Sequence, residues 1–123
     1  MNISVKEWRV GFDIKYEEEY YKLLSFVPNG DVMDVTLVSV RYNTRKNLKL
    51  NKDECLERVI YDTAIYEFGY EEGNEMVFIT GGFDFVGFPK AWFTTINSFG
   101  AGARVEFFLD GDEVVYPYRK VRI

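Results

Sequence analysis

The chain has 123 residues, a length typical of one domain with one core, and we expect residues 1–123 to form a single domain. Hydrophobic residues make up 47% and aromatic residues 18% of it, which excludes a disordered chain and predicts that some aromatic side chains lie on the surface. His is absent and Cys55 is the single cysteine, so Ser–His and Cys–His nucleophilic sites, His-metal sites and internal disulfides are excluded.

The net charge of −5 disfavours general attraction to nucleic acid or to anionic membranes, because that attraction needs clustered Lys and Arg. No apolar stretch approaches the roughly 18 residues that a membrane span requires, and residues 1–8 lack a basic start followed by an apolar run. We therefore expect a cytoplasmic protein whose partner is neither a membrane nor a nucleic acid.

The first half of the chain is predicted to be strands. In residues 8–14, alternation places Trp8 and every second residue after it on one side, as in a half-buried strand. Two apolar runs, 20–27 and 32–42, flank a Pro-Asn-Gly turn and predict a hairpin. Residues 16–21 fit either a short helix or an edge strand.

An amphipathic helix is predicted over residues 52–68. Asn51 can cap it, Glu54 follows at capping-box spacing, and Gly69 can end it. Apolar pairs recur every four residues, at 55/56, 59/60 and 63/64, and form a stripe. Cys55 lies on this stripe, so we expect it to be a buried, unreactive residue.

The last part of the chain is predicted to return to strands, at 75–80, 92–99, 104–109 and 114–121, with a Gly-rich connection over 81–90. Asp110-Gly111 favours the tight turn of a hairpin, and Pro117 predicts that the last strand lies at a sheet edge. The fold class that follows is α+β, mostly antiparallel: a bent sheet or partial barrel of about seven strands with one central helix.

Catalysis is disfavoured by the missing histidine, and we expect no enzyme, no cofactor and no metal site. Asp84, between Phe83 and Phe85, could have its pKa raised by desolvation, but no second carboxylate at a suitable spacing supports a catalytic pair. An enzyme that relies on carboxylates and tyrosines alone is the third-ranked interpretation.

Charge is distributed in blocks. Residues 41–52 hold five cations and no acid, and residues 53–84 hold nine acids against Arg58 alone. Both blocks can be simply solvated, or the acidic block can meet a basic protein surface. The predicted partner-binding residues are Glu67, Glu71, Glu72, Glu75 and Asp84.

The C-terminal strands combine aromatic rings with Arg, which suits an anionic, ring-bearing ligand such as a nucleotide through stacking and phosphate contacts. The residues predicted for this alternative site are Trp92, Phe93, Asn97, Arg104, Tyr118 and Arg119.

Our leading hypothesis is a non-enzymatic protein that masks a macromolecular partner, of the kind represented by immunity proteins and by inhibitors that phages or plasmids encode. The alternative is a small-molecule binder with its pocket in the C-terminal strands. Exposed aromatic strands and an open sheet edge favour a homo-oligomer in either case.

Overall fold

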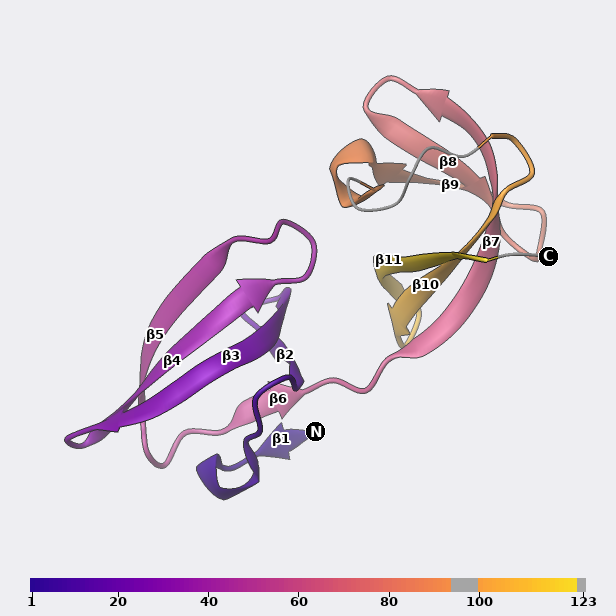
Figure 1. The fold of residues 1–123 in the computed structure, drawn as a ribbon. Coiled ribbons are helices and arrows are strands. Elements are labelled where there is room, and N and C mark those ends of the chain that lie inside the picture. Colours follow the sequence, from indigo (N-terminus) through magenta and orange to yellow (C-terminus); the bar gives the residue numbers. More distant parts are fainter. Residues whose placement is uncertain (94–99, 122–123) are drawn as a thin grey trace. The chain divides into compact units, whose positions relative to one another are not determined.

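A computed structural model describes residues 1–93 and 100–121, which form two antiparallel sheets (Figure 1). The residues divide into two compact units, Met1–Ile60 (unit 1) and Tyr61–Ile123 (unit 2). The described helical segments are two 3-10 turns, η1 (Val5–Glu7) and η2 (Lys90–Phe93). The predicted α+β class is therefore wrong, and the described chain is nearly all β.

Unit 1 is built on a six-stranded sheet. Its spatial order is β1 (Asn2–Ile3), β6 (Leu56–Arg58), β2 (Asp13–Tyr16), β3 (Glu19–Asn29), β4 (Val32–Ser39) and β5 (Arg45–Asn51). The predicted hairpin is confirmed as β3–β4, and Gly30 turns it with a φ of 64°. Residues 16–21, left open by the sequence, form the β2–β3 turn at Glu17 and Glu18, which both have positive φ.

The core of unit 1 lies on one face of this sheet. Met33, Val35 and Leu37 are buried in alternation along β4, as a half-buried strand requires. Trp8 is completely buried against them, and its Nε1 donates to the Ile3 carbonyl oxygen at 3.1 Å. The indole enters from a loop and not from the strand predicted over 8–14, because only Asp13 and Ile14 of that range join β2.

Unit 2 is a five-stranded sheet in the order β11 (Glu113–Val121), β10 (Arg104–Asp110), β7 (Asp62–Glu72), β8 (Glu75–Ile79) and β9 (Phe85–Pro89). Strands β7, β8 and β9 are joined by hairpins, and the fourth strand, β10, returns to lie beside β7. This is a Greek-key arrangement, and five such strands are the topology of an OB-fold. The β10–β11 hairpin and the edge position of Pro117 are confirmed.

Aromatic rings fill the core of unit 2. The Phe78 ring lies 5.4 Å from Phe68, 5.5 Å from Phe93 and 5.0 Å from Phe107, measured between centroids. Pairs at these distances add favourable ring–ring contacts to the burial of apolar area. This core and the core around Trp8 are separate clusters, whereas the chain length led us to expect one core.

No helix forms over residues 52–68, which instead hold β6 and most of β7. Only half of the capping box forms: the Asn51 N–H donates to Glu54 Oε1 at 3.2 Å, while the Glu54 N–H donates to the backbone carbonyl of Asn51 at 3.0 Å and closes an isolated turn. The apolar spacing misled us because residues four apart share a face in a strand as well as in a helix. β-Branched and aromatic residues after position 58 favour the strand.

Three further expectations differ from the structure. Cys55 lies in the turn between β5 and β6 and is exposed, because the stripe that should bury it does not exist. Residues 85–89, expected to be a connection, form β9, and residues 45–51, which the sequence left unassigned, form β5. The strand predicted over 92–99 begins in η2, and its residues 94–99 lie outside the described part.

Candidate functional site

The outer face of β5 is polar and cationic. Arg45, Asn47, Lys49 and Asn51 alternate with Lys46, Leu48 and Leu50, so the first set points to solvent while Leu50 is buried in the core. Successive side chains on that face are about 6.8 Å apart, twice the rise of a strand. β5 is also the outermost strand of its sheet, so this row follows an open edge.

Neighbouring strands support this row with polar contacts. On β4, Thr36 Oγ1 donates to Asn47 Oδ1 at 3.1 Å, and Asp34 Oδ1 lies 3.8 Å from Lys49 Nζ. Asn29 Nδ2 in turn donates to Asp34 Oδ2 at 3.0 Å. The exposed Lys49–Asp34 pair is weak and its cation stays accessible to other anions.

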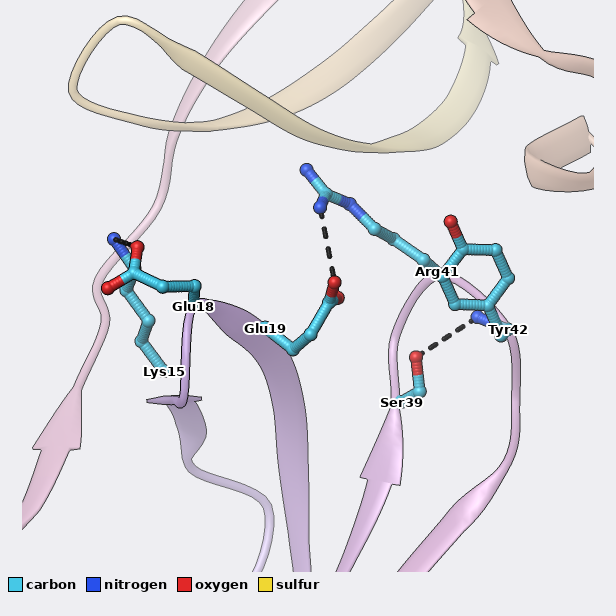
Figure 2. Close-up of polar contacts among 6 residues, drawn as sticks. All are labelled: Lys15, Glu18, Glu19, Ser39, Arg41 and Tyr42. Atoms are coloured by element: carbon cyan, nitrogen blue, oxygen red, sulfur yellow. Dashed lines mark hydrogen bonds and ion pairs between the residues drawn. The ribbon is translucent and has the colours of Figure 1, made fainter.

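The turn between β4 and β5 is held in a defined shape (Figure 2). Ser39 Oγ accepts from the Tyr42 N–H at 3.1 Å, and the Ser39 carbonyl accepts from the Asn43 N–H at 3.0 Å, with Asn43 at a φ of 55°. Arg41, from the same turn, points back toward Glu19, with 3.9 Å between Nη1 and Oε2. Its guanidinium also lies 5.2 Å from the centre of the buried Tyr20 ring.

Three cations at this end of unit 1 face acids of the β2–β3 turn. Arg41 faces Glu19, Lys15 lies 3.8 Å from Glu18, and Lys46 lies 3.6 Å from Glu17. The basic block predicted from the sequence is thus divided. Arg41 and Lys46 meet acids of the β2–β3 turn and Lys49 lies beside Asp34, while Arg45, Lys49 and Lys52 are exposed on or beside β5.

The predicted acidic residues lie in unit 2. Glu67, Glu71 and Glu72 belong to β7, Glu75 starts β8, and Asp84 precedes β9. Lys90 Nζ lies 2.9 Å from Glu71 Oε2, so Glu71 has a cationic neighbour within the unit. Their role in binding a partner stays a prediction.

The residues predicted for a ring-bearing ligand are not brought together. Trp92 and Phe93 are buried in the unit 2 core, and Arg104 pairs across the sheet with Glu67. Arg119 Nε donates to Glu106 Oε1 at 2.9 Å beside the exposed Tyr118, while Asn97 lies outside the described residues. Within residues 1–93 and 100–121, no three His, Cys, Asp or Glu side chains form a group that could hold a metal ion.

Comparison with known proteins finds a relative by sequence similarity and solved structures that share the fold. No protein-family model matches the chain. A stretch of 84 residues, 64% of the chain, is 29% identical to elongation factor P from Erythrobacter litoralis, and the match spans 45% of that protein. Eukaryotic translation initiation factor 5A from Methanococcus jannaschii superposes with a TM-score of 0.73 at 12% identity, over 99% of this chain and 97% of that one.

The chain has the fold of initiation factor 5A. A translation initiation factor 5A family protein from Naegleria fowleri superposes with a TM-score of 0.62 at 9% identity, over 99% of this chain and 96% of that one. The chain spans less than half the length of the elongation factor P that it matches.

These matches contradict our leading hypothesis. The similarity to elongation factor P and the fold of initiation factor 5A point to translation factors and away from inhibitors and immunity proteins. The expectation that nucleic acid is an unlikely partner conflicts with this similarity to translation factors. Net charge misled us, since a chain at −5 can still carry a cationic strand.

The residues that sequence reasoning missed are those of β5. The segment alternates Leu48 and Leu50 with polar residues, a period of two that would have identified the strand and its cationic face. Where membrane association is concerned, the described residues contain no helix long and apolar enough to cross a bilayer.

Proposed function

We propose that this chain is a translation factor that binds the ribosome, with the outer face of β5 contacting ribosomal RNA. It acts in the cytoplasm and carries out no catalytic turnover of its own. The fold likeness to initiation factor 5A over 99% of the chain and the similarity to elongation factor P support this proposal.

The observation that carries the RNA contact is the row of side chains on β5. Arg45 and Lys49 supply cations, and Asn47 and Asn51 supply amide groups, along an open sheet edge. Arg, Lys and Asn are among the side chains that contact phosphate oxygens, and such contacts do not depend on the base sequence. Because Lys and Arg release counterions when they meet phosphates, a short cationic row gives useful affinity despite a negative net charge.

Pelleting with purified ribosomes through a sucrose cushion tests the proposal. We expect the wild-type chain to pellet with ribosomes and the Arg45→Glu, Lys49→Glu double variant to bind about tenfold more weakly or worse, since each reversal replaces a phosphate contact with repulsion. The matched control is Lys6→Glu with Lys120→Glu, which makes the same charge change at exposed residues that do not belong to β5. Failure of the wild type to pellet, or equal loss in both variants, would refute the β5 interface.

A further inference from the structure

The outer face of β7, β8 and β9 in unit 2 exposes aromatic side chains. The exposed fraction is 85% for Phe83, 65% for Phe85 and 47% for Tyr70. The Tyr70 and Phe85 ring centres lie 6.4 Å apart, and Phe85 pairs across the sheet with Ile79. We call these four residues the Phe85 face. Contiguous apolar patches on a surface are typical of interaction sites, and the contact between Tyr70 and Phe85 makes this group more than single exposed residues.

The turn between β8 and β9 holds Phe83 outward. Phe83 has a φ of 62°, a left-handed conformation that bulky residues seldom adopt. The turn fixes it there, because the Phe83 N–H donates to the Thr80 carbonyl at 2.9 Å and the Thr80 N–H donates to the Asp84 carbonyl at 2.9 Å. The phenyl ring of Phe83 is thus held in solvent by a strained backbone conformation. Strain of this kind is typical of functional sites, which favours a role for Phe83 in anchoring a partner.

The surroundings of the Phe85 face are acidic. Residues 61–89 contain six acids and no Lys or Arg, and Lys90, the next residue, pairs with one of these acids, Glu71. Asp84 stands between the two exposed phenylalanines, and Glu72 lies directly opposite Glu75 across the β7–β8 hairpin. Two like charges in that position repel each other, and a cation bound between them relieves the repulsion.

Glu75 reaches across to β9. Its carboxylate lies over the α-carbon of Gly87, in the space that a β-carbon on Gly87 would occupy. Gly87 is on β9, two residues after Phe85. The Glu75 carboxylate therefore lies over β9, the strand that carries Phe85, and not beyond the β7–β8 turn.

We propose that the Phe85 face docks a basic, Arg-containing segment of another protein. Guanidinium groups stack on aromatic faces and pair with carboxylates, and the unit offers Phe83, Phe85 and Asp84 at one end of β8 and Glu72 and Glu75 at the other, so a segment with more than one Arg can use both. Nucleic acid is the wrong partner here, since its phosphates would meet these carboxylates. This docking surface lies on unit 2 and is acidic, whereas the proposed RNA contact on β5 lies on unit 1 and is cationic. The proposal therefore goes beyond the proposed function.

Fluorescence anisotropy with a labelled peptide of alternating Arg and Leu tests the proposal, with a Glu and Leu peptide as the control probe. We expect the Arg peptide alone to bind, and Phe83→Ala and Phe85→Ala each to weaken it by about tenfold, as loss of a central aromatic anchor does. Neutralising Glu72, Glu75 and Asp84 together, as Gln, Gln and Asn, should weaken binding to a similar degree. The matched control neutralises Asp31, Asp53 and Asp112, which are exposed turn residues elsewhere, and should change affinity by less than about twofold.

Several outcomes would overturn the proposal. Equal weakening by both triple variants would mean general electrostatic attraction, and full binding by Phe85→Ala would mean that the rings do not contribute. A dimer in analytical ultracentrifugation that Phe85→Ala dissociates would assign the face to a second copy of this chain. Binding of a single-stranded RNA that Phe85→Ala abolishes would assign it to nucleic acid.

Arg45→Glu with Lys49→Glu should leave peptide binding intact, so failure of this proposal and failure of the ribosome proposal are distinguishable.

Discussion

Asp13 is a carboxylate whose burial opposes its charge. Burial raises the pKa of the Asp13 carboxyl above its usual value near 3.8, and Lys22, with Nζ 3.5 Å from Oδ1, offsets only part of this rise. The folded protein therefore holds this proton more tightly than the unfolded chain does. Stability contributed by the protonated form is complete below the usual pKa and is lost as the pH rises through the folded pKa.

We predict that Asp13→Asn stabilises unit 1 relative to the wild type more at neutral pH than at about pH 3. Asparagine keeps the shape of the protonated acid and carries no charge to desolvate. Urea denaturation of both proteins at the two pH values measures the difference. A variant whose advantage grows on acidification would show that the ion pair with Lys22 outweighs burial.

Cys55 is expected to react as an exposed thiol. It lies in the turn between β5 and β6, four residues after the end of β5. Ellman's reagent should label it in the folded protein at a rate within about tenfold of the denatured chain. Cys55→Ser should change the free energy of unfolding by less than about 0.5 kcal/mol, as for other surface substitutions. Slow labelling that requires unfolding would restore the buried position that the sequence suggested.

At the scale of elements, β5 should determine how RNA binding responds to salt. Lys49 and Arg45 are exposed on its outer face, so each can displace counterions from one phosphate. We predict that Lys49→Ala lowers the slope of log affinity against log salt concentration by about one unit and weakens all RNA sequences alike. Filter binding to ribosomal RNA fragments over a salt series gives the slope, and an unchanged slope would remove Lys49 from the interface.

Elements with a local signal were predictable from the sequence. The β3–β4 and β10–β11 hairpins follow from turn chemistry between apolar runs, and both form with glycine at positive φ. The edge position of β11 was predictable because Pro117 has no backbone N–H to donate to a neighbouring strand. β9 was hidden because it follows two glycines and itself contains Gly87 and Pro89, residue types that are common in loops.

The helix predicted over 52–68 shows where local signals fail. The capping hydrogen bond from the Asn51 N–H to the Glu54 side chain exists, yet pairing of β6 with β1 and β2 and of β7 with β8 and β10 determines the conformation after it. Helix propensity is a weak preference that such tertiary pairing overrides. The candidate site on β5 was not predicted for a similar reason. The sequence shows a block of cations, and it is the pairing of residues 45–51 as a strand that places Arg45 and Lys49 in a row on one face.

At the scale of the whole molecule, the two units offer independent reporters. Trp8 is buried in unit 1 and Trp92 in unit 2, so Trp92→Phe and Trp8→Phe variants each leave one indole to report on one unit. Leu23 is completely buried in unit 1, and Leu23→Ala should remove about 3 kcal/mol of its stability.

We predict that Leu23→Ala shifts the denaturation midpoint reported by Trp8 and leaves that reported by Trp92 in place. Each unit has its own core, so a cavity in one need not destabilise the other. Urea titrations of the two single-tryptophan proteins, with and without Leu23→Ala, measure this. Equal shifts at both indoles would support the single domain expected from the chain length.

Cys55 also permits the most direct test of the ribosome proposal, because it is exposed and lies next to the end of β5. An iron chelate tethered to Cys55 generates hydroxyl radicals that cleave nearby RNA in a bound ribosome. The account predicts cleavage at a few discrete positions of ribosomal RNA, lost with Arg45→Glu and Lys49→Glu. It also predicts a different pattern when the chelate is moved to the β10–β11 turn by Cys55→Ser with Asp112→Cys. Absence of discrete cleavage from Cys55 on ribosomes that retain the protein would contradict it.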